Sequence, residues 1–219
     1  MYSVSGSVAP FARPRPTYGR PIRHQLQKGM ILMPIRVYID QGHNPSAPNS
    51  GAEGNGYREQ DLVYEIGQRL YALLSRDPAF EARLSRPTPG TYVGTSNSSS
   101  LRERVNAANA WPADLFLSLH TNAAASSDAS GVEGLVYATG TKAADIAADL
   151  VASVVRTTGQ RDRGVKARPG LYVLRKTTMP AVLMELGFIS NPADADLMAN
   201  RPGLFAEGLY RGLKSYYGV

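Results

Sequence analysis

The chain has 219 residues, a formal net charge of +6 and no cysteine. Its length suits one domain with a substantial core, and the missing cysteine excludes disulfides, thiolate metal ligands and cysteine nucleophiles. No apolar run approaches the roughly 18 residues of a membrane-spanning helix, so we expect a protein that does not insert into a membrane.

The positive charge is concentrated at the N-terminus. The first 36 residues contain no acidic side chain, and their basic residues account for the whole net charge: Arg13, Arg15, Arg20, Arg23, Lys28 and Arg36. Residues 37–219 are therefore formally neutral, which argues against nucleic acid as a partner. Prolines alternate with these arginines without lasting periodicity, so residues 1–33 are predicted to be a disordered basic extension. They do not fit a secretory signal peptide, because they lack its apolar segment of roughly 7–15 residues.

Strands and helices alternate along the chain from residue 35. In chain order we predict a strand at 35–40, a helix at 59–75, a weak strand at 82–85, a helix from about 100 to 110, strands at 115–119 and 132–138, a helix at 142–157, strands at 171–174 and 181–184, and helices at 193–199 and 203–217. The strands are inferred from β-branched and aromatic runs, and the helices from apolar residues at helical spacing. Ser99 or Ser100 is the expected cap of the second helix.

The run Leu115-Phe-Leu-Ser-Leu119 is apolar on both faces, as in a strand buried between two helical layers. Strands that alternate with helices predict an α/β fold with a largely parallel sheet. We therefore expect a single domain, residues 34–219, with a central twisted, mostly parallel sheet flanked by helices on both faces.

Four residues at the ends of these elements suggest a metal site. His43 follows the first strand, and Glu59 begins the helix after it. His120 and Glu185 end two other strands. Because active sites of α/β sheets form at the carboxyl ends of the strands, these four side chains are expected to converge. Two histidines and a carboxylate can hold zinc with a fourth position open to water, and a second carboxylate can accept a proton from that water.

Each of these residues also has a simpler explanation. A histidine in a polar loop, such as His43, is usually exposed or hydrogen-bonded, and a glutamate in the first turn of a helix, such as Glu59, is favoured by the helix dipole. His120 and Glu185 carry more weight, because a buried imidazole or carboxylate needs a cation or hydrogen-bonding partners. The hypothesis therefore rests on the whole set.

Ordered blocks of sequence extend this pattern over roughly residues 35–218. They are Val37-Tyr-Ile-Asp-Gln-Gly-His43, Ser50-Gly-Ala52, Glu59-Gln-Asp-Leu62, Leu101-Arg-Glu-Arg104 with Ala108-Asn109, Asp114-Leu-Phe-Leu-Ser-Leu-His-Thr-Asn122, Gly131-Val-Glu133, Val173-Leu-Arg175 and Met179-Pro-Ala-Val-Leu-Met-Glu-Leu-Gly-Phe-Ile-Ser-Asn191. In this order they resemble the zinc-dependent N-acetylmuramoyl-L-alanine amidases of bacteria and their phages. The resemblance implies that His43, Glu59 and His120 bind one Zn²⁺ ion and that Glu185 is the catalytic carboxylate.

The resemblance also implies a reaction. Members of the family hydrolyse the amide between the lactyl group of N-acetylmuramic acid and the L-alanine of the stem peptide, so peptidoglycan is the expected partner. Zinc would activate the attacking water, and Glu185 would act first as general base and then as general acid toward the leaving nitrogen. We expect a monomer that acts on the cell wall. Because no signal peptide is visible, the protein would reach the wall either as a phage lysin or by another export route.

The chain departs from the family beside the first histidine. Many members have Pro and Gly there, where this chain has Gln41 and Asn44. Arg86, Arg104 and Asn122 lie in matching blocks, and each is either a substrate contact or a structural residue. Asp40 is expected to support the site without binding metal, because the ligand set already contains a carboxylate.

Two alternative functions remain open. One is a zinc peptidase that uses the same metal chemistry on the stem peptide. The other is a non-catalytic peptidoglycan-binding protein of the same fold, whose sign would be a missing ligand or a missing Glu185. Neither is missing from this sequence.

Overall fold

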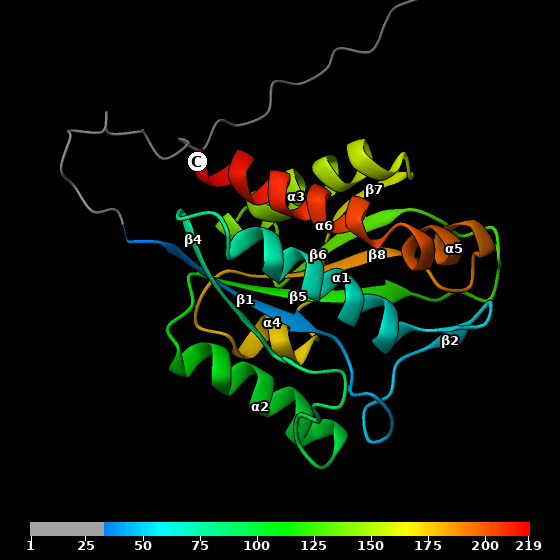
Figure 1. The fold of residues 1–219 in the computed structure, drawn as a ribbon, viewed down its shortest axis with the longest axis horizontal. Helices are drawn as coiled ribbons and strands as arrows, with labels where there is room; N and C mark the ends of the chain where they lie inside the picture. Colours follow the sequence, from blue (N-terminus) through cyan, green and yellow to red (C-terminus); the bar gives the residue numbers. More distant parts are fainter. Residues whose placement is uncertain (1–32) are drawn as a thin grey trace, which may run out of the picture. The chain divides into compact units, whose positions relative to one another are not determined.

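The structure is a computed structural model, and it describes residues 33–219. The disordered extension predicted for residues 1–33 lies outside the described residues, apart from Met33. The described chain builds a six-stranded sheet in the order β4-β1-β5-β8-β6-β7 (Figure 1). The strands are β1 (Ile35–Gln41), β4 (Phe80–Leu84), β5 (Leu115–Asn122), β6 (Val132–Val136), β7 (Asp162–Ala167) and β8 (Ala181–Phe188). Within this sheet all neighbours are parallel except β6 and β8, so the predicted mostly parallel sheet is confirmed.

Helices cover both faces of the sheet (Figure 1). The helices of the first face are α1 (Glu59–Leu74), α3 (Lys142–Thr158) and α6 (Pro202–Tyr217), and those of the second face are α2 (Asn97–Ala110) and α4 (Tyr172–Lys176). Between β8 and α6 lies α5 (Pro192–Asn200). The predicted α/β class with two helical layers is confirmed. Among the described helices, none has both the length and the apolar character that crossing a membrane requires.

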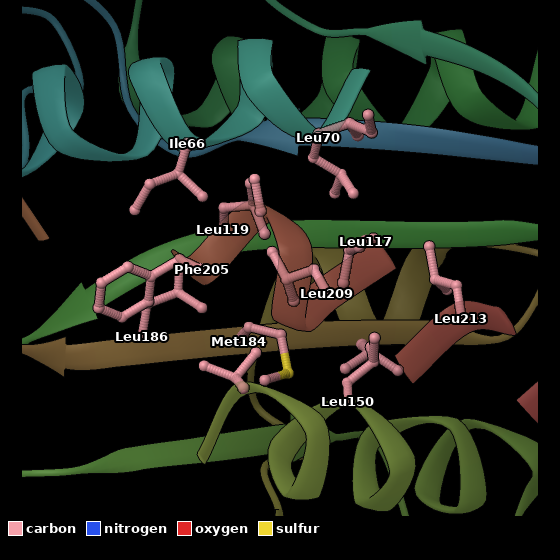
Figure 2. Close-up of a cluster of buried hydrophobic side chains, with 14 of the residues drawn as sticks. Ile66, Leu70, Leu117, Leu119, Leu150, Met184, Leu186, Phe205, Leu209 and Leu213 are labelled. Carbon is pink, nitrogen blue, oxygen red and sulfur yellow. The ribbon is translucent and has the colours of Figure 1, made fainter. Parts of the chain in front are cut away.

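The larger apolar core lies between the sheet and the helices of the first face (Figure 2). Fully or almost fully buried side chains meet there from α1 (Ile66, Leu70), β5 (Leu117, Leu119), α3 (Leu150), β8 (Met184, Leu186) and α6 (Phe205, Leu209, Leu213). Burying one such side chain contributes about 1.5–3 kcal/mol. Alternate residues of β5 and β8 point to the second face, and His120 and Glu185 are among them because side chains alternate along a strand.

One predicted strand is wrong. Residues 171–174 enter α4, which begins at Tyr172 after Leu171 in an extended conformation. The four apolar residues of this run are too few to reveal a helical period, so their composition alone favoured a strand.

Two other features differ from the predictions. The edge strand β7 and the hairpin of β2 (Glu53–Gly54) and β3 (Tyr57–Arg58) were not expected, because their sequences are short and largely polar. The cap of α2 is Ser96, whose hydroxyl accepts from the backbone N–H of Ser99, so Ser99 and Ser100 already belong to the helix.

Candidate metal centre

Three residues meet at the carboxyl end of the sheet. His43 lies two residues after β1, Glu59 is the first residue of α1, and His120 lies in β5. One potential ligand atom from each lies within 4.8 Å of the other two. The structure thus brings together the three side chains that the sequence pattern singled out as metal ligands.

Glu59 is the centre of this cluster. Its Oε1 lies 2.9 Å from Nδ1 of His120, and its Oε2 lies 3.2 Å from Nε2 of His43. The backbone N–H groups of Thr121 and Ala52 donate to the same two oxygens, at 2.9 and 3.0 Å. Burial opposes ionisation, but the contacts with the imidazoles outweigh it and hold the pKa of Glu59 well below its ordinary value. The carboxylate is therefore charged and fixed in orientation.

The two imidazole rings lie edge to face, with centroids 4.9 Å apart and an interplanar angle of 78°. Their side chains are 19% and 20% exposed for His43 and His120, so a ligand can reach both rings from solvent. Burial lowers the pKa of His120, yet its contact with Glu59 outweighs burial and holds the pKa above the ordinary value. The raised pKa means that His120 retains a proton more readily, and a metal ion that binds to the imidazole would replace this proton.

Arg104 of α2 holds the loop that carries His43. The guanidinium is 1% exposed and donates to Oδ1 of Asp40 at 2.6 Å, to the backbone oxygen of Gln41 at 2.7 Å and to the backbone oxygen of His43. Ser118 donates to the other carboxylate oxygen of Asp40 at 2.8 Å. Burial would raise the pKa of Asp40, but Arg104 holds it below its ordinary value. Arg104 is therefore a structural residue of the loop, and Asp40 is its partner.

Glycine is required next to His43. A Cβ at Gly42 would lie 2.5 Å from Cε1 and 2.6 Å from Nε2 of His120, so any side chain there would have to displace the imidazole. His43 itself has a φ of 66°, in the left-handed region that non-glycine residues adopt at a cost of about 1 kcal/mol. The loop therefore depends on its surrounding hydrogen bonds to keep the imidazole in place.

The two departures from the family pattern provide some of these hydrogen bonds. Asn44 donates to the backbone oxygens of Pro48 and Val93 and accepts from the N–H of Val93 at 3.0 Å. Gln41 accepts from the backbone N–H of Arg86 at 2.9 Å. Both substitutions therefore brace the ligand loop, and they leave the three candidate ligands in place.

Glu185 lies in β8 directly opposite His120 of β5. Its Oε2 is buried and has no hydrogen-bond partner within residues 33–219. Burial raises the pKa of Glu185 to about 7; His120 opposes this rise, whereas the charges of Glu59 and Glu133 add to it. A carboxylate with this pKa can take up and release a proton near neutral pH.

The side chains present fit a zinc ion. Two imidazole nitrogens and one carboxylate oxygen are a recurring zinc ligand set that leaves one position open. One ligand atom from each of the three residues lies within 4.8 Å of the other two, so bonds of about 2.0–2.1 Å from all three can meet at one ion. The buried Oε2 of Glu185 has no hydrogen-bond partner among the described residues, and a water molecule or a cation bound beside it would supply one. The group His43, Glu59 and His120 can therefore bind a metal ion.

A small cavity of about 130 Å³ adjoins the two histidines. Much of its wall is apolar and comes from Leu101 of α2, from Leu171 and Val173 at α4 and from Leu183 of β8. This lining would place apolar contacts beside the candidate metal ligands.

Glu133 of β6 adds a polar cluster that was not predicted from the sequence. Sheet register places Glu133 opposite Glu185. Arg163 and Lys166 of β7 both form ion pairs with its Oε2, and Asn122 donates to its Oε1 at 3.3 Å. The block Gly131-Val-Glu133 marks the position, but no spacing along the chain signals contacts between separate strands.

Most of the chain matches one known protein family. Residues 37–215 match the family model Amidase_3, described as N-acetylmuramoyl-L-alanine amidase. The chain is 35% identical over 179 residues to the sporulation-specific N-acetylmuramoyl-L-alanine amidase of Bacillus subtilis (strain 168), a match covering 81% of this chain and 65% of that protein. It is 37% identical over 186 residues to the amidase LytC of the same organism, covering 83% and 35%. The chain thus spans less than two thirds of these two relatives.

Solved structures agree with the fold. The crystal structure of an N-acetylmuramoyl-L-alanine amidase from Clostridium difficile 630 has a TM-score of 0.76 at 29% identity, over 84% of this chain and 97% of that one. The catalytic domain of CwlV from Bacillus (Paenibacillus) polymyxa var. colistinus has a TM-score of 0.74 at 30% identity, over 84% and 99%. Nearly the whole of each of these two amidase structures is thus matched by the described residues.

Proposed function

Because the chain belongs to the N-acetylmuramoyl-L-alanine amidase family, we propose that residues 34–219 form a catalytic domain that hydrolyses peptidoglycan. The bond cut is the amide between the lactyl group of N-acetylmuramic acid and the L-alanine of the stem peptide. The site of action is then the cell wall, in keeping with relatives that include a sporulation amidase and the endolysin of Bacillus phage SPP1.

His43, Glu59 and His120 would hold one Zn²⁺ ion in this proposal. When bound, the ion would activate a water molecule and polarise the scissile carbonyl. Glu59 orients both imidazoles, and the backbone N–H groups of Ala52 and Thr121 fix Glu59 in turn. The ligands are therefore largely preorganised by the chain itself.

Glu185 is the proposed acid–base residue. Its Oε2 accepts a proton from the attacking water and then delivers it to the L-alanine nitrogen as the C–N bond breaks. The products are a free lactyl carboxylate and a stem peptide with a free amino group. Amide nitrogen is a poor leaving group without this proton, so its protonation by Glu185 would make the C–N bond easier to break.

The observation that carries the proposal is the convergence of two imidazoles and Glu59 beside the unpartnered oxygen of Glu185. Digestion of purified sacculi by the zinc-loaded chain, followed by mass spectrometry, tests it. Intact stem peptides with a free L-alanine amino group are expected. Cuts within the stem would identify a zinc peptidase, and no release with or without chelator would identify a non-catalytic wall-binding protein.

Substitutions test the individual roles. Glu185→Gln is expected to keep zinc and to lose roughly a hundredfold to ten-thousandfold in rate, the usual contribution of a general acid–base residue. His43→Ala or His120→Ala is expected to lose both zinc and activity. Glu103→Gln, on the exposed side of α2, is the matched control. Wall lysis by Glu185→Gln at the wild-type rate would refute the role assigned to Glu185.

A further inference from the structure

A row of three side chains crosses the carboxyl end of the sheet. His120 of β5 pairs in register with Glu185 of β8, and Glu185 pairs with Glu133 of β6. Directly paired residues project from the same face of a sheet, and neighbouring strands lie about 4.8 Å apart. Glu133 therefore lies one strand beyond Glu185, on the side away from the candidate metal ligands.

Glu133 anchors two cations from the next strand. Its side chain is 5% exposed, and its Oε2 contacts both Nε of Arg163, at 3.1 Å, and Nζ of Lys166. The side-chain amide of Asn122 donates a hydrogen bond to the other carboxylate oxygen, Oε1. The guanidinium of Arg163 also lies over the ring of Phe188, 4.8 Å from its centroid. These contacts fix both basic side chains beside the row that contains Glu185.

The charges of this cluster do not cancel. Arg163 and Lys166 bring two positive charges, and Glu133 brings one negative charge. The carboxylate is buried, whereas the side chains of Arg163 and Lys166 are 26% and 36% exposed. One excess positive charge is thus presented at the surface next to Glu185, where a bound anion can reach it.

The proposed reaction determines which part of the substrate lies there. Glu185 must reach the leaving nitrogen to protonate it, so the leaving peptide lies on the Glu185 side of the metal ligands. That is the side of Glu133 and β7. The group that approaches Lys166 therefore belongs to the stem peptide, and carboxylates are the anionic groups of a peptide.

We propose that Lys166 and Arg163, held by Glu133, form a subsite for a carboxylate of the stem peptide just beyond L-alanine. This inference rests on the proposed function, because the reaction sets the orientation of the peptide. It adds a binding site for an acidic residue on the leaving side of the scissile amide. Charge-assisted hydrogen bonds to the carboxylate would favour acidic over amidated stems.

The test compares two soluble substrates for the zinc-loaded chain: N-acetylmuramoyl-L-alanyl-D-glutamate and its fully amidated form. The wild type is expected to prefer the acidic substrate roughly tenfold or more in kcat/KM. Lys166→Gln should reduce this ratio severalfold, while Arg163 still neutralises Glu133. Lys166→Arg should keep most of the ratio. Lys142→Gln, exposed at the start of α3 on the other face, is the matched control and should leave the ratio unchanged.

A binding measurement separates this inference from the proposed function. Titration of L-alanyl-D-glutamate and its diamide, followed by NMR, requires no turnover. The subsite is supported if the wild type binds L-alanyl-D-glutamate more tightly than the diamide and Lys166→Gln does not. This result would support the subsite even if neither substrate were cleaved, and only the proposed function would then be refuted. Cleavage of both substrates at the same ratio in wild type and Lys166→Gln overturns the subsite and leaves the amidase proposal standing.

Discussion

The two faces of the sheet bury different chemistry. Under α1, α3 and α6 the buried layer is mostly aliphatic and aromatic, although the buried guanidinium of Arg86 lies over the ring of Tyr64 in α1. Under α2 and α4 an apolar patch gives way, toward the carboxyl ends of the strands, to the buried charges of Asp40, Arg104 and Glu133, and Glu59 joins them from the start of α1. Burying a charge costs free energy unless a partner compensates it, and each of these charges has one. The comparison indicates that one face supplies most of the stability and the other carries the candidate chemistry.

The largest expected effect on stability belongs to the apolar face. Phe205→Ala in α6 should lower the free energy of unfolding by about 3–5 kcal/mol, because it removes a fully buried ring and leaves a cavity. Zinc affinity of the folded molecules should not change, since none of the candidate ligands belongs to the apolar cluster that contains Phe205. Urea unfolding and zinc titration against a competing chelator measure the two quantities. Loss of zinc binding in a folded Phe205→Ala protein would contradict this division.

Arg104→Met should affect both quantities. Removing one partner of a buried ion pair costs about 3 kcal/mol, and the backbone oxygen of His43 loses its donor. The double variant Arg104→Met/Asp40→Asn should regain part of the stability, because no unpaired carboxylate remains. It should not regain zinc affinity, because His43 is still unsupported. Recovery of both in the double variant would show that Arg104 acts only through its charge.

The pH dependence of the metal-free protein should reveal Glu185. Its pKa is raised from 4.5 to about 7, chiefly by burial, so the folded state prefers the protonated acid. The contribution of the protonated acid to the free energy of unfolding is fully present below pH 4.5. It is lost as the pH rises toward 7, and the loss is about 2 kcal/mol once screening by solvent is included. Urea unfolding at several pH values should show this fall in the wild type and a flatter curve in Glu185→Gln. Identical curves would contradict the raised pKa.

The smallest effect on stability is expected at Gly42. Gly42→Ala places a methyl group against the His120 imidazole, which should cost about 1 kcal/mol and weaken zinc binding by displacing a ligand. Gly90→Ala is the control, because a Cβ there meets nothing within 4 Å. Equal zinc affinity in the two variants would mean that His120 lies elsewhere in the loaded protein.

Much of this architecture follows from clear patterns in the sequence. The run Leu115-Phe-Leu-Ser-Leu119 predicts a central strand, and it places His120 at the edge where α/β sheets bind ligands. The strand at 171–174 is a wrong prediction because four apolar residues contain too little periodicity. The edge strand β7 escapes prediction because its side chains are mostly polar.

Contacts between segments that are far apart in the chain cannot be predicted from the spacing of residues along the sequence. The sequence left Arg104 either as a substrate contact or as a structural residue, and only the fold shows its burial against Asp40. The cluster around Glu133 likewise depends on the order of β8, β6 and β7 in the sheet. The candidate ligands were more predictable, because strand ends and helix starts gather at one edge of an α/β sheet.

X-ray diffraction of zinc-soaked crystals at the zinc absorption edge tests the central claim most directly. The account predicts one anomalous peak per chain, bounded by Nε2 of His43, Nδ1 of His120 and the carboxylate of Glu59, with Glu185 facing it and not bonded to it. No peak at this position, or a peak held by other residues, would contradict the account.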